Sequence, residues 1–521
     1  MSRVSTKPAI NSRVECDDVY GTVKYVGSVT GTSGVWIGVD WDSSERGKHD
    51  GSYKDIRYFN ASKPNSGSFI RATKLNFGKS FFEALIDRYE NNVEMASEAL
   101  LTLSQNQGTD RRIELIGFDK VAEKLKNLSQ LLVIDLCKQC IAYAGHNPSV
   151  KLPTANHLDI SSNLLSSWTE VAKIVTHLPS LEGLVVSGNK LVVEKCDNLS
   201  SHFDKVKYLV FGKVGYTWND VISVIGSLFR YMESLDVWGN AITEIAKPLN
   251  GIFSPLKSLN LSDNKISDWQ QICKLGDLPL LENLQLRNCD ITEIYFDDNL
   301  LPTEKTQLFP VLKCLNLSQN CISKWTSVAN LNRLPSLEVL QISSNPVYGK
   351  EKYDTVYNLI IGKIAKLQVL NKAEISKCQR KEAEVYYLKR FYSNWLEKGE
   401  ENVDSFIREH PLYAQLLNYY GEPTELQNKS ANNREKKFIQ VKLKYAQTEK
   451  VIDKRLPSNM TIRMLRVMVK RLFNIGPFKP FDLIVENANR SKITYSLDDE
   501  LETLNYFSVE NGDTIVAQAY L

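Results

Sequence analysis

The sequence of 521 residues lacks the features that mark several large classes of protein. It has no apolar run near the ~20 residues that a membrane-spanning helix needs, and its first residues hold no apolar core of the kind that a signal peptide requires. The 64 Lys and Arg residues nearly balance the 61 Asp and Glu residues, so the net charge is only +3. Such a balance gives no general argument for a nucleic acid or a membrane surface as partner. We therefore expect a cytoplasmic protein that binds neither.

The residues of catalytic and metal sites are equally scarce. The nine cysteines are scattered and odd in number, which favours free thiols in a reducing compartment. Cys137 and Cys140 have the one metal-like spacing, and no second pair of ligands lies near them in sequence. The six histidines include no His-Glu-x-x-His pair, and no nucleophile elbow or set of kinase motifs occurs. We expect no enzyme activity, no metal and no cofactor.

What the sequence does contain is a long internal repeat. The whole chain is too long for one ordinary core, and its length predicts about three domains. A period near 25 residues runs from about Leu131 to Val347 and follows the template L-x-x-L-x-L-x-x-N-x-L. The asparagine position is filled by Asn163, Asn189, Asn240, Asn264, Asn320 and Asn345, by Gln139 and Cys289 in two variants, and by Val214 in the least regular unit.

The template predicts a stack of short strands. The L-x-L step places two apolar side chains on one face of each strand, and the asparagine can bond the backbone of the adjoining turn. No single unit buries its apolar face alone, so neighbouring units must stack into a solenoid. The pattern resembles the leucine-rich repeat family. Binding then belongs to outward positions between and just after the strand leucines, for which the candidates are Asp236, Trp238, Gln285 and Arg287.

Two segments follow the repeats. The sequence "LQVLNKAEISKCQRKEAEVYYLKRFYSNWLEK" has a helical pattern that would cover the open end of the stack. A polar stretch rich in helix breakers comes next and predicts a linker. We expect the solenoid and its helical cap over residues 91–425 and the linker over residues 426–436.

The N-terminal part has another composition. Runs such as "YGTVKYVG" and "GVWIGVDWD" alternate like strands and predict a small β-rich module. Residues 1–80 hold 12 Lys and Arg against 8 Asp and Glu, so this module carries about +4 and suits an acidic partner. The module also contains the sequence Gly47-Lys48-His49-Asp50-Gly51 and, further on, Gly67-Ser68-Phe69-Ile70. It resembles the CAP-Gly domain, whose loop usually reads Gly-Lys-Asn-Asp-Gly. We expect this domain and a following helix over residues 1–90.

The resemblance implies a groove for acidic peptides that end in an aromatic residue, such as the C-terminal tail of α-tubulin. Glycines let the peptide approach the backbone, and Lys48 supplies a compact positive charge. His49 departs from the usual asparagine but can still donate a hydrogen bond, so we expect altered geometry or affinity and a weak dependence on pH. The implied tail-binding residues are Trp36, Gly47, Lys48, His49, Asp50, Gly51, Phe59, Gly67, Ser68 and Phe69.

The C-terminal part, residues 437–521, reads as strand, hairpin, helix and further strands. Ile462, Leu465, Val469 and Leu472 recur at helical spacing between "FIQVKLKYA" and "DTIVAQAYL". The pattern resembles a ubiquitin-like β-grasp domain. The sequence ends in Ala-Tyr-Leu and not in the Gly-Gly that conjugation requires, so we expect a docking module and not a modifier.

The order of the three domains resembles the tubulin-folding cofactor E family. The resemblance implies capture of α-tubulin and, with other cofactors that carry β-tubulin and activate GTP hydrolysis, assembly or dissociation of the αβ heterodimer. It also implies a cytoplasmic, cytoskeleton-associated protein without covalent chemistry. The ubiquitin-like domain would contact another cofactor or the proteasome and ubiquitin machinery.

Two alternatives stay open. A cytoskeletal adaptor would bind assembled microtubules or plus-end proteins, although the long repeat array and the lack of a coiled coil argue against it. A ubiquitin-pathway enzyme would need a catalytic cysteine near a histidine and an acid, or a zinc framework, and neither is visible in the sequence.

Overall fold

The chain divides into two compact units. One unit covers residues 1–387 and 393–413, and the other covers residues 388–392 and 414–521. None of the helices that the structure describes is long and apolar enough to cross a membrane. The linker predicted at residues 426–436 lies outside the residues that the structure describes. The computed structural model describes residues 9–91, 127–147, 150–194, 197–249, 251–397, 403–423, 438–448, 450–476, 480–486, 494–507 and 509–519.

The first unit begins with a four-stranded antiparallel sheet in the order β1-β2-β3-β6. Alternate residues of β3 point to opposite faces, so Ile37, Val39 and Trp41 enter the small core while Trp36 and Gly38 lie on the other face. That second face carries the candidate site. The elements are β1 (Arg13–Cys16), β2 (Val19–Ser28), β3 (Val35–Trp41), β4 (Ser52–Tyr53), β5 (Ile56–Arg57), β6 (Gly67–Ile70) and the 3-10 helix η1 (Ala72–Lys74).

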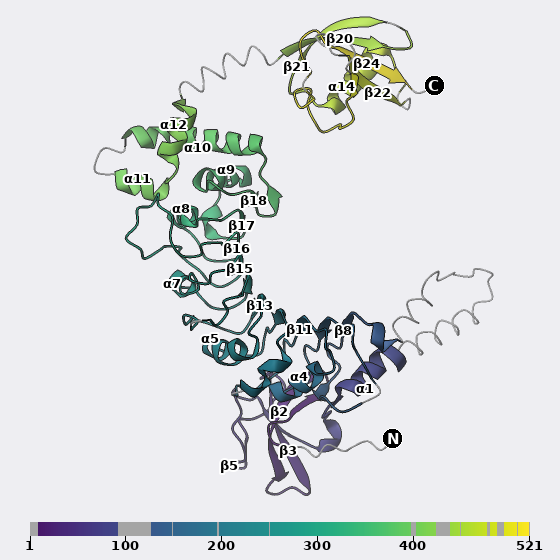
Figure 1. The fold of residues 1–521 in the computed structure, drawn as a ribbon, viewed down its shortest axis with the longest axis vertical. Coiled ribbons are helices and arrows are strands. Elements are labelled where there is room, and N and C mark those ends of the chain that lie inside the picture. The colour runs from purple at the N-terminus through teal and green to yellow at the C-terminus, as the bar shows by residue number, and fades with distance from the viewer. Residues whose placement is uncertain are drawn as a thin grey trace, which may run out of the picture. The chain divides into compact units, whose positions relative to one another are not determined.

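The helix that follows this sheet packs against the repeats. Strand β7 (Lys79–Ser80) pairs with β9 (Ile141–Tyr143) of the first repeat, and α1 (Phe81–Ile86) continues from it. Ser80 and Glu83 form a capping box that starts α1. Phe81 and Leu85 lie in the same buried cluster as the repeat leucines, and Figure 1 places α1 beside β8. The helix predicted as part of the 1–90 module therefore covers the first end of the solenoid, and one helical turn, η2 (Asp87–Asn91), follows it.

The repeats form a solenoid with a sheet of 11 strands in the order β19-β18-β17-β16-β15-β14-β13-β12-β11-β10-β8 (Figure 1). From β8 to β18 the neighbours are parallel, and the central residues of the strands are in register. The predicted leucine-rich repeat fold is confirmed. Its strands are β8 (Val133–Asp135), β10 (His157–Asp159), β11 (Gly183–Val185), β12 (Tyr208–Val210), β13 (Ser234–Asp236), β14 (Ser258–Asn260), β15 (Asn283–Gln285), β16 (Cys314–Asn316), β17 (Val339–Gln341), β18 (Val369–Leu370) and β19 (Ala373–Glu374).

The repeat asparagines bond the backbone of the turns, as predicted. Asn163 donates to the carbonyl oxygens of Leu136 and Ile160, both at 2.9 Å, and accepts from the backbone N–H of Ile141 at 2.9 Å. These groups are buried, and an unpaired buried backbone group would cost free energy. The asparagines are therefore structural.

The solenoid also has a longer period that the 25-residue template did not reveal. In every second repeat a tryptophan is the first residue of the helix that follows the strand. Three of these tryptophans are fully buried in the shared core, so the helical repeats carry a large packing group that the intervening repeats lack. The tryptophans are Trp168, Trp218, Trp269 and Trp325, and the helices that they start are α4 (Trp168–Val175), α5 (Trp218–Asp220), α7 (Trp269–Cys273) and α8 (Trp325–Asn330).

Charged residues alternate with the same longer period at the entrance of the strands. Lysines 207, 257 and 313 lie in the tryptophan repeats and each pairs with a glutamate of the preceding repeat. The distances are 3.2 Å for Lys207–Glu182, 2.7 Å for Lys257–Glu233 and 3.1 Å for Lys313–Glu282. From β11 to β16 the charges at this edge of the sheet are therefore paired.

Short helices lie between the repeats, and a helical cap follows the last one. Within the cap Lys363 is fully buried beside Tyr387 and His410, and burial lowers the pKa of Lys363 to about 7 and that of His410 to about 3. The short helices are η3 (Leu128–Gln130), η4 (Asp197–His202), η5 (Val221–Ile225), α6 (Gly226–Leu228), η6 (Leu331–Arg333) and η7 (Pro346–Tyr348). The cap contains α9 (Tyr353–Lys363), α10 (Lys377–Glu397) and α11 (Val403–Glu409), and the next helix, α12 (Tyr413–Tyr420), has most of its residues in the second unit.

The second unit contains a five-stranded sheet in the order β21-β20-β24-β22-β23. The first and last strands, β20 and β24, are parallel neighbours, and α14 packs Ile462, Leu465 and Val469 into the core. This order of strands and one packed helix is that of a β-grasp, so the predicted ubiquitin-like fold is confirmed. Its elements are β20 (Phe438–Tyr445), β21 (Val451–Pro457), α14 (Ile462–Phe473), β22 (Phe481–Glu486), β23 (Thr494–Ser496) and β24 (Thr514–Ala519).

Candidate peptide-binding site

The loop Gly47–Gly51 is bonded to the first residue of β6. The backbone N–H groups of Lys48 and His49 both donate to the carbonyl oxygen of Gly67, at 2.7 and 3.1 Å. In return the N–H of Gly67 donates to the carbonyl oxygen of His49 at 2.7 Å. The two motifs that the sequence separates by fifteen or more residues therefore form one site.

Glycine is required at both ends of this loop. A Cβ atom at Gly47 would lie 1.9 Å from the carbonyl oxygen of Asn65. At Gly51 the φ angle is +100°, and a Cβ atom would lie 2.0 Å from the carbonyl oxygen of Phe59. The neighbours are backbone atoms that cannot move aside, so no other residue fits.

The ring of His49 accepts a hydrogen bond within this loop. Its Nδ1 atom accepts a hydrogen bond from the backbone N–H of Gly51 at 3.0 Å. Because Nδ1 is the acceptor, the proton of the neutral ring is on Nε2, which is the donor. Burial lowers the pKa of His49, and the nearby Asp50 opposes this only in part.

The two charged residues of the loop differ in their surroundings. Asp50 pairs with Arg57 at 2.7 Å, and the hydrogen bond from Arg57 is the main reason that the pKa of Asp50 is lowered. Lys48 is exposed, and none of the ion pairs within residues 9–91 includes it. The charge left for a ligand at this loop is therefore positive.

Phe69 is the centre of an aromatic cluster beside the loop. Its ring lies 4.9 Å from that of His49, 5.3 Å from Tyr58 and 5.6 Å from Phe59. Tyr25 follows at 6.2 Å and Tyr53 at 6.5 Å. Most of these pairs meet edge to face, which is a favourable arrangement of aromatic rings.

Strand register explains how this cluster forms. Tyr25, Gly38 and Phe69 are directly opposite one another on β2, β3 and β6 and so share one face of the sheet. Gly38 has no side chain, and the ring of Phe59 fills the space above it, because a Cβ atom there would lie 2.5 Å from Phe59. The glycine thus makes the seat for Phe59.

The remaining sequence candidates lie around this cluster in different ways. Trp36 is on the same face as Gly38, but its ring is covered by the Arg71 guanidinium at 3.8 Å and its indole N–H donates to Thr32 at 2.8 Å. Ser68 is buried on the opposite face of β6 from Phe69.

Three tyrosines of the cluster, Tyr25, Tyr53 and Tyr58, are absent from the sequence candidates. The alternation of "YGTVKYVG" gave the strand, but only the register to Gly38 places Tyr25 beside Phe69. Lys54 and Asp55 have positive φ angles, so a tight hairpin carries Tyr53 to the cluster.

The repeat-face candidates also differ from one another. Asp236 accepts hydrogen bonds from Asn260 at 2.9 Å and from the N–H of Trp238 at 3.2 Å. Trp238 lies over Gly212, and the Lys213 ammonium is 4.8 Å from its ring. Gln285 accepts from Asn316, and the exposed Arg287 donates to Gln319.

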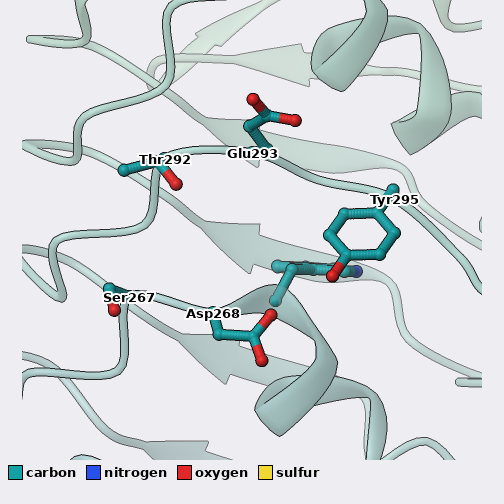
Figure 2. Close-up of a pocket in the computed structure, with 6 residues that line it drawn as sticks. Ser267, Asp268, Thr292, Glu293 and Tyr295 are labelled. Carbon is teal, nitrogen blue, oxygen red and sulfur yellow. The ribbon is translucent and has the colours of Figure 1, made fainter.

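A shallow hollow on the solenoid lies apart from both candidate sites. It has a volume of about 330 Å³ and is lined by Ser267, Asp268, Trp269, Thr292, Glu293 and Tyr295. Figure 2 shows the Tyr295 hydroxyl turned towards the Asp268 carboxylate. Asp268 caps α7 and Glu293 pairs with Lys324, so both carboxylates already have structural partners.

Two family models match parts of this chain. The family model of the CAP-Gly domain matches residues 10–75, and a leucine-rich repeat model matches residues 235–394. The solution structure of the C-terminal ubiquitin-like domain of mouse tubulin-specific chaperone E is 23% identical, with a TM-score of 0.15, and covers 16% of this chain and 89% of that one. The three parts define a modular protein with a CAP-Gly domain, a leucine-rich-repeat solenoid and a ubiquitin-like domain.

Two relatives match over nearly their whole length. Tubulin-specific chaperone E of Homo sapiens is 34% identical over 535 residues, which cover 99% of this chain and 100% of that protein. The same protein of Danio rerio is 34% identical over 529 residues, which cover 98% and 99%. The chain belongs to the tubulin-specific chaperone E family.

Proposed function

We propose that this chain is a tubulin-folding cofactor that captures α-tubulin, with the CAP-Gly groove holding the acidic C-terminal tail. The observation that carries the proposal is the exposed Lys48 next to the aromatic cluster around Phe69. A tail that ends in glutamates and an aromatic residue offers the complementary groups. Its carboxylates match Lys48, and its last ring matches Phe69 and the neighbouring tyrosines.

The loop makes the groove selective for negative charge. Arg57 neutralises Asp50, so this acid does not repel a carboxylate as a free aspartate would. His49 adds the Nε2–H donor on the neutral ring. Donors and a cation without an unpaired acid suit an acidic peptide better than a basic one.

The wider role rests on the family. With cofactors that carry β-tubulin and others that activate GTP hydrolysis, the chain assembles, and also dissociates, the αβ heterodimer. It works in the cytoplasm in association with the cytoskeleton, by binding and without covalent chemistry. The repeat face holds the folded body of α-tubulin, and the ubiquitin-like domain contacts another cofactor or the degradation machinery. Two weak contacts on one client raise the effective concentration of the second.

Fluorescence anisotropy with a labelled α-tubulin tail peptide tests the groove. We expect the full chain to bind the peptide, removal of the last tyrosine to weaken binding, and Lys48→Ala to weaken it by about tenfold or more. Lys24→Ala is the matched control. It removes a lysine of the same domain that lies in β2 and not in the loop, and whose ammonium bonds Asn11 at 3.3 Å. Equal binding by wild type and Lys48→Ala would contradict the groove.

Co-sedimentation distinguishes the cofactor from a cytoskeletal adaptor. A cofactor forms a complex with unassembled tubulin and stays in the supernatant of polymerised microtubules. An adaptor sediments with the polymer, and that result would favour the alternative function.

A further inference from the structure

The strand face of the solenoid, meaning the outward side chains at the first and third positions of β8 to β17, is divided into two halves. In the half nearer the CAP-Gly domain, from β8 to β13, five of these positions carry aromatic or aliphatic side chains and three carry aspartates. Two of the apolar side chains are strongly exposed, Val133 by 60% and Tyr208 by 43%. We call this half the aromatic patch, with Trp238 after β13 included. Its members are Val133, His157, Val185, Tyr208, Val210 and Trp238.

Register and two glycines create the aromatic patch. His157, Gly183 and Tyr208 are opposite one another on three neighbouring strands, and the rings of His157 and Tyr208 are nearly parallel with centroids 6.4 Å apart. A Cβ atom at Gly183 would lie 2.4 Å from the His157 ring, and one at Gly212 would lie 2.3 Å from the Trp238 ring. The His157 ring therefore packs against the backbone at Gly183, and the Trp238 ring packs against the backbone at Gly212.

The other half of the strand face is polar and bonded to itself. Its outward residues include Ser258, Asn283 and Cys314, and Gln285 accepts from Asn316 at 2.9 Å. Amides that already bond one another gain little from a partner. The aromatic side chains of the strand face end with Trp238, just after β13.

The charged side chains at the outward strand positions are acidic. Two cations lie next to this face: Arg88 pairs with Asp135 at 3.7 Å, and the Lys213 ammonium is 4.8 Å from the Trp238 ring. The outward positions of β8 to β17 include three aspartates, Asp135, Asp159 and Asp236, and no lysine or arginine. Asp236, beside Trp238, receives two hydrogen bonds, but none of the ion pairs among the described residues includes it. Burial raises the pKa of Asp236, and the hydrogen bonds from Asn260 and from the Trp238 N–H oppose this only in part.

We propose that the aromatic patch docks a segment of the α-tubulin body whose apolar side chains are flanked by lysine or arginine. This inference rests on the proposed function and gives the second contact its chemistry. The apolar side chains cover Val133, Tyr208 and Trp238, and a basic side chain meets the Asp236 carboxylate. The two contacts on the client thus have opposite charge, since the CAP-Gly groove takes an acidic tail.

Contacts between the CAP-Gly domain and the first repeats support the aromatic patch, and not the polar half of the strand face, as the docking surface. The Tyr20 hydroxyl donates to the carbonyl oxygen of Ser162, just after β10, at 3.1 Å. Lys79 of β7 pairs with Ile141 of β9 in the first repeat. A client held by its tail in the groove is therefore held by a domain that contacts the repeats of the aromatic patch.

The test uses the full chain and two probes, αβ-tubulin whose C-terminal tails have been removed by limited proteolysis, and the labelled tail peptide. The variants are Tyr208→Ala and Asp236→Asn. Their matched controls at the same strand positions in the polar half are Asn283→Ala and Gln341→Ala. Biolayer interferometry measures tail-less tubulin, and anisotropy measures the peptide.

We expect both variants to bind tail-less tubulin about tenfold more weakly or worse, while the controls bind as wild type and all variants bind the peptide within about twofold of wild type. Binding of wild type to tail-less tubulin should weaken with salt, and less so in Asp236→Asn. If both variants bind tail-less tubulin like wild type, or if wild type does not bind it at all, the inference is overturned. If wild type binds tail-less tubulin but does not bind the peptide, the proposed tail groove is wrong and the inference about the aromatic patch is supported.

Discussion

The CAP-Gly sheet and the solenoid sheet both place a glycine in register between two aromatic residues, and they use the space above it differently. In the CAP-Gly sheet the row is Tyr25, Gly38 and Phe69, and in the solenoid it is His157, Gly183 and Tyr208. Above Gly38 a third ring, Phe59, is packed and only 7% exposed. Above Gly183 the space is occupied by the ring of His157, which is exposed.

The difference separates a packed cluster from an open surface. Phe59 is fixed because its own N–H and that of Tyr58 both donate to the carbonyl oxygen of Gly51, at 3.4 and 3.1 Å. The backbone of His157 is held in β10, but its ring is exposed and bonds the side chain of the neighbouring Asn156 at 3.0 Å. The aromatic cluster around Phe69 is therefore pre-organised for the proposed tail, which lowers the cost of binding, whereas the aromatic patch can rearrange around the proposed client.

The largest effect should come from adding one methyl group to each glycine. Gly38→Ala forces Phe59 and the Tyr25 Cβ apart, and we expect a loss of about 1–3 kcal/mol in the local stability of the CAP-Gly sheet, with loss of tail binding. Gly183→Ala meets an exposed ring that can turn away, and we expect a change within about 1 kcal/mol. Hydrogen exchange of peptides that cover β3 and β11 measures the two effects in the full chain.

The control for this pair is Gly215→Ala, where a Cβ atom would meet nothing within 4 Å but the φ angle is +87°. It reports the cost of backbone strain without a steric clash. If Gly38→Ala and Gly183→Ala lost equal protection, the contrast between packed and open would be wrong.

A smaller effect should come from removing one ring of each row. Phe69 has five aromatic neighbours but is only partly buried, so Phe69→Ala should destabilise the CAP-Gly sheet by roughly 1–2 kcal/mol. Tyr208→Ala should cost less than about 1 kcal/mol, because its side chain is already exposed. Denaturant titration followed by hydrogen exchange in the two sheets checks both values. A Tyr208→Ala cost close to that of Phe69→Ala would show that Tyr208 is a core residue and not part of an open surface.

Much of this architecture is readable from the sequence because it depends on local pattern. The strand leucines, the asparagines such as Asn163, and the helix with Ile462, Leu465 and Val469 all follow from a fixed spacing. The loop Gly47–Gly51 is likewise visible as a motif, and the structure adds that backbone atoms of Asn65 and Phe59 are what forbid a side chain at its ends.

The parts that the sequence did not reveal depend on contacts between distant strands. Tyr25 and Tyr58 join Phe69 only through the register of β2, β3 and β6. The pairing of Asp50 with Arg57 leaves Lys48 as the available charge of the loop, although the sequence places an acid and a base side by side. Spacing could have revealed the longer period, because Trp168, Trp218 and Trp269 recur at nearly equal intervals of about two repeats.

The smallest effect concerns His49 and sharpens the account of the packed cluster. In His49→Asn the amide oxygen can accept the same hydrogen bond from the Gly51 N–H, so the loop should keep its stability at neutral pH. In His49→Ala the half-buried N–H of Gly51 loses its acceptor, and we expect a loss of about 1 kcal/mol. Hydrogen exchange of a peptide covering residues 47–59 distinguishes the two variants. Equal protection in the alanine and asparagine variants would contradict the role of Nδ1.

The same residue gives the groove a dependence on pH whose sign follows from its lowered pKa. Between the folded-state pKa and the ordinary value of about 6.5, the unfolded chain binds a proton that the folded loop does not, so stability falls on acidification. The contribution is fully present above that ordinary value and should be absent in His49→Asn. The helical cap has its own acid sensitivity, since burial lowers the pKa of His410 to about 3, so the measurement must follow the loop peptide and not the whole chain. Protection of the loop that falls equally with pH in wild type and His49→Asn would assign the effect to other groups.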